Sequence, residues 1–259
     1  MIYTIHKFKA IIKVVPKAAC TSTKYYLHQL LAEDDLKLKE IINGKHPHDM
    51  TIFKYLKNQG DVFLQESILK NLIFDENYSC YIVYRNPIDR FYSGCVQKYL
   101  SHLPNCNKSL IEPLCPSPRL RNFYLWFISN VSCNLEDVNW KSLIDYHCNL
   151  QHNFEIDPHF LPISDIVPVF FLENSKLIST NGLYSNLNKI FSKCFTDKYF
   201  NVTNKEGDIS NNYNSKILNT SIIDPRIKTN CSYYIKSVEK KFINDIFLYK
   251  DKLKHMNYI

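Results

Sequence analysis

The chain has 259 residues, of which 45% are hydrophobic, 14% aromatic and 22% charged. This is enough apolar material for one well-filled core, and it excludes a disordered tail, a collagen-like fibre and a minimal disulfide-stapled module. The net charge of +7 suits an anionic ligand but is too small to indicate nucleic acid by itself. Five glycines leave little room for a Gly-rich phosphate loop, so any phosphate site must use other residues. We expect a single domain over residues 1–259.

The cysteines and the N-terminal residues bear on the compartment. Nine cysteines are present, and none forms a CxxC pair or a Cys/His cluster with zinc-ligand spacing, so we expect no zinc site. Lys7 and Lys9 interrupt the N-terminal apolar residues, and the chain has no apolar run of about 18 residues, which predicts neither a signal peptide nor a membrane span. We therefore expect a cytoplasmic protein with free thiols, in which Cys106 and Cys115 would pair only after export.

The first half of the chain contains two strand–turn–helix units in succession. Phe8–Val15 alternates Lys with Ile and Val and is followed by a proline, after which apolar residues at helical spacing predict a helix from Thr21. Tyr78–Tyr84 is a second run rich in β-branched and aromatic residues, and it is closed by Asn86-Pro87. The following segment, Ile88–Leu100, again has helical spacing.

The rest of the chain adds helices, loops and one more strand. Prolines predict a loop over 101–118, and Asn and Ser residues predict another over 201–219. Ile166–Leu172 is predicted as the third strand. Helical spacing is found in Leu120–Asn130, Trp140–Leu150, Leu183–Phe191 and Cys231–Tyr249. Short strands separated by helices predict an α/β fold with a parallel sheet and helices on both faces.

The turn after the first strand has the composition of an anion cradle. It joins a buried strand to a helix, so its backbone N–H groups and the positive end of the helix dipole act at the same point. Small side chains would let the backbone close around an oxygen, hydroxyl groups would donate to it, and a lysine would supply positive charge. The residues of this candidate site are Lys17, Ala18, Ala19, Cys20, Thr21 and Ser22. The alternative is an ordinary helix N-cap with a solvated lysine.

Arg85 occupies the equivalent position after the second strand. It stands at the carboxyl end of that strand, where ligands of open α/β sheets bind, and a guanidinium can hold a phosphate through two hydrogen bonds. Ser93 lies two helical turns further on and could reach back to a second phosphate oxygen. The alternative for Arg85 is a salt bridge at a strand end.

Together the two segments resemble the nucleotide-binding motifs of sulfotransferases that use 3′-phosphoadenosine-5′-phosphosulfate (PAPS). Pro-Lys-Ala-Ala-Cys-Thr, which ends at Thr21, resembles the 5′-phosphosulfate loop of the chondroitin- and dermatan-type carbohydrate sulfotransferases. Arg-Asn-Pro-Ile-Asp-Arg-Phe-Tyr-Ser, which begins at Arg85, resembles their 3′-phosphate motif. Asp157–Pro162 and Lys241–Tyr249 are similar to two further segments of the same enzymes, so the resemblance covers nearly the whole chain.

The resemblance implies a P-loop-like, three-layer α/β fold with a central parallel sheet flanked by helices. It also implies transfer of a sulfuryl group from PAPS to a hydroxyl of a saccharide or polysaccharide, with adenosine 3′,5′-bisphosphate (PAP) as product and no metal. In this interpretation Lys17 stabilises the leaving phosphate, residues 18–22 hold the 5′-phosphosulfate, and Arg85 and Ser93 hold the 3′-phosphate. We expect neither nucleic acid nor a membrane among the partners.

Several residues are candidates for the base that takes the proton of the acceptor hydroxyl. Histidine titrates near neutral pH, and His159 lies where the chondroitin-type segment has its histidine. His46, His48 and Glu66 are alternatives, because other carbohydrate sulfotransferases use a His or Glu between the two nucleotide motifs. Two other functions stay open: a P-loop-type kinase, against which the missing glycine loop argues, and an inactive nucleotide- or glycan-binding module.

Overall fold

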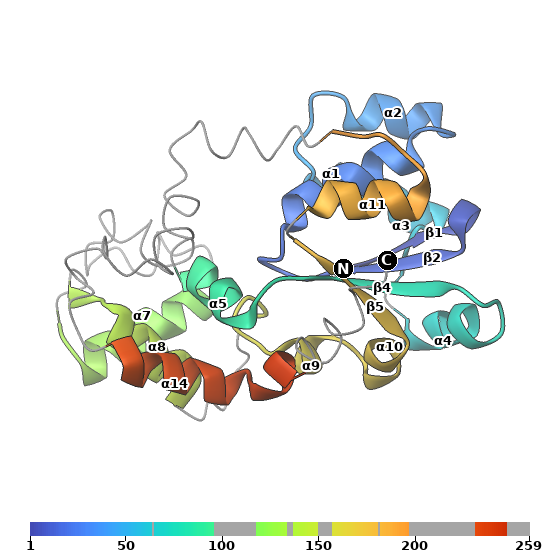
Figure 1. Cartoon of the computed structure of the whole chain (residues 1–259). Coiled ribbons are helices and arrows are strands. Elements are labelled where there is room, and N and C mark those ends of the chain that lie inside the picture. Colours follow the sequence, from blue (N-terminus) through green and yellow to red (C-terminus); the bar gives the residue numbers. More distant parts are fainter. Residues whose placement is uncertain are drawn as a thin grey trace. The chain divides into compact units, whose positions relative to one another are not determined.

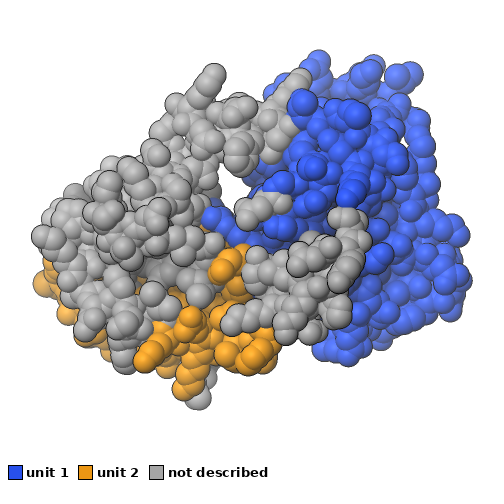
Figure 2. Space-filling view, viewed as in Figure 1, with its two compact units in different colours: residues 1–85, 167–206, 249–259 blue, residues 86–166, 207–248 orange. Residues whose placement is uncertain are grey.

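The structure is a computed structural model of the whole chain, and it falls into two compact units, which Figure 2 colours separately. Unit 1 comprises residues 1–85, 167–206 and 249–259, and unit 2 comprises residues 86–166 and 207–248. The structure describes residues 1–63, 65–95, 118–133, 137–149, 157–180, 182–196 and 231–247. The single domain over residues 1–259 stays a prediction.

Unit 1 is built on a five-stranded sheet with the strand order β3-β1-β2-β4-β5 (Figure 1). The strands are β1 Ile2–Ile5, β2 Ala10–Val14, β3 Val62–Phe63, β4 Ser79–Tyr84 and β5 Ser175–Ser179. β2, β4 and β5 are parallel to one another, whereas β1 is antiparallel to both of its neighbours, β2 and β3. The predicted parallel sheet is therefore confirmed at its centre, with an antiparallel strand next to it.

The two strands at the centre of the sheet are those whose apolar runs are most continuous. Ile11 and Ile12 of β2 and Ile82 and Val83 of β4 are all fully buried, although successive residues of a strand point to opposite faces. Side chains buried on both faces are expected where helices cover the sheet on both sides. The predicted strands Phe8–Val15 and Tyr78–Tyr84 correspond to β2 and β4.

Helices cover both faces of this sheet. In Figure 1, α1 and α11 lie on one face, and α4 and α10 lie on the other. Tyr26 of α1 packs edge-to-face on Tyr184 of α11, with ring centroids 5.1 Å apart. The helices of unit 1 are α1 Cys20–Leu31, α2 Leu36–Ile42, α3 Met50–Gln59, α4 Glu66–Phe74, α10 Val169–Glu173 and α11 Leu183–Phe191, and a 3-10 turn spans His6–Phe8. Unit 1 thus has the three-layer arrangement that the resemblance implied.

Unit 2 is helical in its described part. Its elements are α5 Pro87–Cys95, α7 Pro118–Asn130, α8 Trp140–Ile144 with a π-helical turn over Asp145–Asn149, α9 Ile163–Ile166 and α14 Cys231–Lys241, followed by helical residues 243–247. Five fully buried phenylalanines dominate its core: Phe91, Phe123, Phe127, Phe160 and Phe242. Gly94 of α5 faces the Phe160 ring, and a Cβ at Gly94 would lie only 2.9 Å from it. The core is therefore packed closely enough to require a glycine on this helix.

The third strand differs from its prediction. The segment Ile166–Leu172 holds the end of α9 and most of α10, and the strand next to β4 is Ser175–Ser179. Pro168 directly precedes α10, and its φ of −57° is suited to starting a helix. β1 lies outside the predicted strands, although its residues Ile2, Tyr3 and Ile5 are buried. The prediction missed β1 and placed the third strand several residues too early.

Several further expectations concern features that the structure describes only in part. No helix in the described ranges is long and apolar enough to span a membrane. The cysteines in those ranges carry free thiols. Cys106 and Cys115 lie outside the described residues, as does the predicted loop over 201–219 and all but the last residue of the loop over 101–118.

Candidate functional site

The turn between β2 and α1 has a backbone conformation that glycine usually supplies. The Ala18 N–H donates to the Val15 carbonyl at 3.2 Å, and the two residues between them are Pro16 and Lys17. Lys17 has a φ of 64°. Proline followed by a residue of positive φ is the pattern of a type II turn, in which glycine or asparagine is normal at the second position. Lys17 thus holds its side chain at a position where most lysines would be strained.

Ala19, the residue before α1, is left-handed as well, with φ 49° and ψ 39°. Left-handed residues on either side of Ala18 turn neighbouring N–H groups toward one side, as in the nests that bind anions. Ala19 has no side-chain acceptor with which to cap the helix, so the first N–H groups of α1 are left for another acceptor. Because each left-handed non-glycine residue costs roughly 1–2 kcal/mol, this conformation points to a functional turn.

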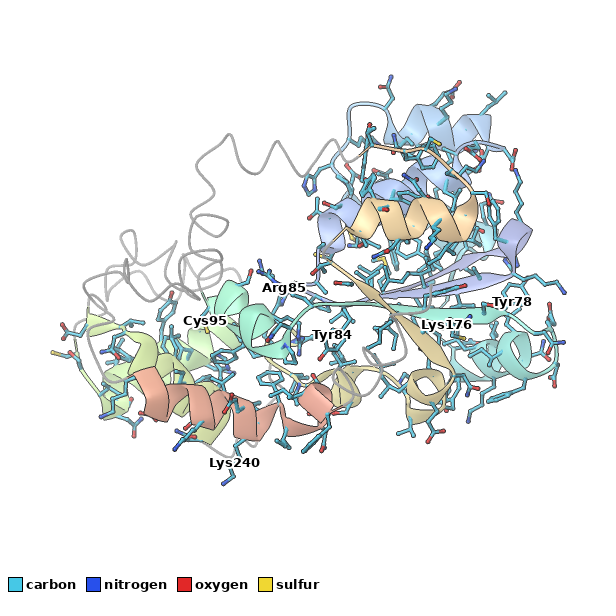
Figure 3. The ribbon with its side chains drawn as sticks, in the orientation of Figure 1. Tyr78, Tyr84, Arg85, Cys95, Lys176 and Lys240 are labelled. Carbon is cyan, nitrogen blue, oxygen red and sulfur yellow. The ribbon has the colours of Figure 1, made fainter. Side chains whose placement is uncertain are left out.

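The strand register brings Arg85 to the same turn. β2 and β4 pair in parallel with Val14 opposite Val83, so the residues that follow the two strands leave the sheet side by side. Arg85 Nη1 donates to the Lys17 carbonyl oxygen at 3.4 Å. Figure 3 labels Arg85 at one end of β4 and Tyr78 at the other. Lys17 and Arg85 therefore share the carboxyl edge of the sheet, where open α/β sheets bind their ligands.

A loop histidine also reaches the first turn of α1. His48, which lies between α2 and α3, has Nε2 3.1 Å from Thr21 Oγ1 and 3.9 Å from Cys20 Sγ. Its other ring nitrogen, Nδ1, is 3.0 Å from Lys24 Nζ. Both ring nitrogens of His48 are thus in contact with residues of α1. The structure brings this candidate base to the turn, but neither nitrogen is left to receive a proton from a substrate.

The electrostatic environment around α1 is positive. Although part of His48 is exposed, desolvation of the rest, followed by the charges of Lys24 and Lys17, lowers the pKa of His48 to about 4. Burial, followed by Lys24 and His48, lowers the pKa of His28 to about 3. Burial also lowers the pKa of Lys13, on β2. The positive charges behind these shifts are those of Lys24 and Lys17, and they favour an anion as ligand.

Two other candidate bases of unit 1 lie near the surface. His46 is exposed; its Nδ1 accepts from the His48 backbone N–H at 3.3 Å, and its ring stacks on that of His48 with centroids 5.3 Å apart. Glu66 begins α4 and forms an ion pair with Lys70 at 2.8 Å, in which both side chains are more than half exposed. An exposed pair of this kind is ordinary surface structure.

Ser93 and His159 belong to unit 2. Ser93 lies on α5 and is 5% exposed. His159 follows Asp157-Pro158, and the Asp157 carboxylate accepts hydrogen bonds from both the backbone N–H and the ring Nδ1 of His159. A carboxylate on Nδ1 fixes the ring so that Nε2 is the nitrogen with a free lone pair. His159 therefore has the geometry of a base, whereas His48 does not.

Two cationic residues of these segments are buried, although charged side chains are mostly exposed. Lys24 is only 8% exposed. It lies three positions after Thr21 on α1, a spacing that puts the two side chains on one face and could have indicated their relation. Arg90 is fully buried beside Asp245. No local pattern reveals that partner.

Two neighbouring parallel strands, one followed by a turn with left-handed residues and the other by an arginine, define the chain as a P-loop-like α/β protein. The model of the sulfotransferase family matches residues 2–250, and the chain belongs to that family. Neither the search of curated proteins nor the search of solved structures gave a match. No group of three or more His, Cys, Asp or Glu that could hold a metal ion occurs among the described residues.

Proposed function

We propose that the protein transfers the sulfuryl group of PAPS to a hydroxyl of a carbohydrate. Family membership gives the reaction type; the donor and the acceptor are our proposal. One observation carries it: Arg85 Nη1 lies 3.4 Å from the Lys17 carbonyl, so a guanidinium reaches the turn that carries Lys17 and has uncapped N–H groups. A dianionic phosphate needs both a positive charge and several donors, and this turn offers both.

The residues of the turn fit the 5′-phosphosulfate group of PAPS. Ala18 and Ala19 have small side chains that leave room for the phosphate, and alanine restricts the backbone more than glycine does. Ala18 is fully buried. The hydroxyl groups of Thr21 and Ser22 and the N–H groups from Ala19 to Ser22 are the proposed donors, because the Ala18 N–H already donates to the Val15 carbonyl. The 3′-phosphate is assigned to Arg85 and Ser93 by the resemblance to the family motif.

Lys17 and a base carry the proposed chemistry. When bound, PAPS supplies the sulfuryl group, whose bond to the phosphate oxygen breaks as the bond to the acceptor oxygen forms. Lys17 stabilises the negative charge that develops on the departing phosphate. His159 accepts the proton of the acceptor hydroxyl on Nε2, while Asp157 holds Nδ1–H and stabilises the resulting imidazolium. No metal has a role in these steps.

A carbohydrate acceptor is supported by two resemblances. Pro-Lys-Ala-Ala-Cys-Thr and the Asp157–Pro162 segment are similar to those of the chondroitin- and dermatan-type enzymes. The net charge of +7 suits a polymer that becomes acidic as it is sulfated.

Calorimetry with PAP, adenosine 5′-phosphate and ATP tests the donor. We expect PAP to bind at least about tenfold more tightly than adenosine 5′-phosphate, which corresponds to one hydrogen-bonded phosphate or about 1.4 kcal/mol. Tighter binding of ATP, dependent on magnesium, would overturn the proposal in favour of a kinase.

Transfer from radiolabelled PAPS to a panel of glycans, with and without a chelator, tests the acceptor and the absence of a metal. We expect transfer to at least one glycan at the same rate with chelator. Tight PAP binding without transfer to any glycan would indicate a binding module. For the base, His159→Gln should lower kcat by roughly 10²–10⁴-fold with unchanged PAP affinity, and His6→Gln serves as the matched control.

A further inference from the structure

Lys24 is a buried cation beside the anion-binding turn. It is 8% exposed, and its Nζ lies 3.0 Å from His48 Nδ1. Within the described ranges, no carboxylate forms an ion pair with it. Burial lowers the pKa of Lys24, while the nearby Cys20 raises it. A buried ammonium whose only described hydrogen-bond partner is a neutral ring is costly, and a bound anion would compensate its charge.

The contact with Lys24 decides which nitrogen of His48 carries the hydrogen. An ammonium can only donate, so His48 Nδ1 must accept. The lowered pKa of His48, about 4, keeps the ring neutral at pH 7, and a neutral ring has a single N–H. That N–H is therefore on Nε2, which faces Thr21 Oγ1 at 3.1 Å.

The hydrogen bond from His48 in turn directs the Thr21 hydroxyl. A hydroxyl that accepts from His48 Nε2–H keeps its own single hydrogen for a different acceptor. Thr21 is the second residue of α1, where the backbone N–H groups have no cap from Ala19. A hydroxyl hydrogen and uncapped N–H groups at one helix terminus suit the same anion.

We propose that Lys24 and His48 are positioning residues of the phosphosulfate site: Lys24 fixes the His48 tautomer, and His48 fixes Thr21 as a hydrogen-bond donor to the anion. This inference rests on the proposed binding of PAPS in the turn. The chain of donors runs from the buried ammonium outward, so every hydrogen bond in it becomes stronger when a negative charge arrives at its end.

The other groups around His48 do not compete for its nitrogens. His46 stacks on the ring, and Cys20 Sγ is 3.9 Å from Nε2, farther than Thr21. The charge of Lys17 helps to lower the pKa of His48, and His48 in turn helps to lower the pKa of His28. With both nitrogens engaged, His48 orients the site and takes no substrate proton.

A double-mutant cycle on PAP affinity, measured by calorimetry at pH 7.5, tests this chain. Thr21→Val and His48→Leu should each weaken PAP binding about tenfold, the value of one hydrogen bond to a charged group. Because both act through the same hydroxyl hydrogen, the double variant should bind only about as weakly as either single one. Losses that multiply to about 100-fold would overturn the proposal.

Rescue separates positioning from a merely structural role. His48→Gln keeps an amide that can accept from Lys24 and donate to Thr21, so it should retain PAP affinity within about threefold. His6→Gln is the matched control, because His6 Nδ1 makes a similar bond, 2.9 Å to the Tyr78 hydroxyl, at the opposite end of β4. If His48→Gln binds as weakly as His48→Leu while His6→Gln binds normally, the proposal fails.

The tautomer itself can be read without any ligand or activity. In ¹⁵N-histidine-labelled protein we expect His48 as the Nε2–H form, with Lys24→Met allowing the Nδ1–H form to appear. An Nδ1–H ring in the unaltered protein would refute the proposal. Should Lys24→Met fail to fold, the double-mutant cycle at Thr21 and His48 still tests the proposal. If the unaltered protein does not bind PAP, the proposed function fails as well; if it does and the cycle is multiplicative, only the positioning chain fails.

Discussion

Arg90 and Asp245 form an ion pair that is almost completely buried, with Arg90 Nη2 3.7 Å from Asp245 Oδ2 and exposures of 0% and 1%. Asp245 also accepts from the backbone N–H of Ile163 at 2.7 Å, and Arg90 donates to the Leu161 carbonyl. The guanidinium lies 5.4 Å from the centre of the Phe242 ring. Three segments that are far apart in the sequence, those holding Arg90, Leu161 and Asp245, are thus joined by one buried charge pair in unit 2.

Asp245→Asn should therefore destabilise the protein strongly. Removing one partner of a buried ion pair leaves an uncompensated charge, which costs about 3–5 kcal/mol of unfolding free energy. Urea unfolding followed by circular dichroism measures the loss. Asp165→Asn is the control, since Asp165 is exposed and should change stability by less than about 0.5 kcal/mol. Equal urea midpoints for the two variants would show that the buried ion pair does not stabilise the protein to this extent.

Lys17→Gly distinguishes the effect of backbone strain at residue 17 from the effect of the lysine charge. Glycine tolerates a φ of 64°, so the variant should be more stable by about 1 kcal/mol while sulfuryl transfer falls by roughly 10²–10³-fold. Ser192→Gly relieves similar strain, at φ 51°, in a residue outside the site and should leave transfer unchanged. Thermal unfolding and steady-state kinetics of both variants provide the comparison. Transfer by Lys17→Gly at the normal rate would remove Lys17 from the mechanism.

Arg85→Lys should reduce the preference for the 3′-phosphate. Lysine keeps the charge but loses the two-pronged geometry with which arginine holds phosphate. We expect the ratio of PAP affinity to adenosine 5′-phosphate affinity to fall about tenfold, with the second affinity nearly unchanged. Calorimetry with both nucleotides gives the ratio. Equal losses for the two ligands would assign Arg85 to the 5′-phosphate instead.

His28 should make folding stability fall in acid. It is 3% exposed, its Nε2 is 3.1 Å from the Tyr3 hydroxyl, and its pKa is lowered from 6.5 to about 3. Between these values the unfolded chain binds a proton that the folded protein excludes. The stability is thus complete above pH 6.5 and decreases by about 1.4 kcal/mol per pH unit as the pH falls toward 3. In His28→Gln this part of the slope should vanish, which unfolding at pH 6, 5 and 4 would detect, whereas His6→Gln should retain it.

The sequence predicted the elements whose signals are local. A buried apolar run ended by proline identified β2, and β-branched residues followed by Asn86-Pro87 identified β4 and the start of α5. Short apolar runs do not distinguish a strand from a buried helix, which is why the segment ending at Leu172 was misassigned. The polar residues Ser175 and Lys176 made the true strand β5 less conspicuous.

The residues of the candidate site also fall into two groups, those with a local sequence signal and those without one. Lys17 and Arg85 could be found because each follows a recognisable strand, and the parallel register of those strands brings them together. The contacts of His48 with Thr21 and Lys24 depend on how the loop between α2 and α3 folds back onto α1, which no local spacing encodes.

The alanines of the turn have one more consequence. Glycine gives a phosphate loop freedom that must be lost when a ligand orders it, whereas Ala18 and Ala19 restrict the chain even before it folds. With left-handed residues at Lys17 and Ala19, the turn takes its final shape during folding. The proposed association of a nucleotide would then require little ordering of the backbone. The scarcity of glycine thus makes the proposed anion site a rigid receptor whose geometry exists before its ligand arrives.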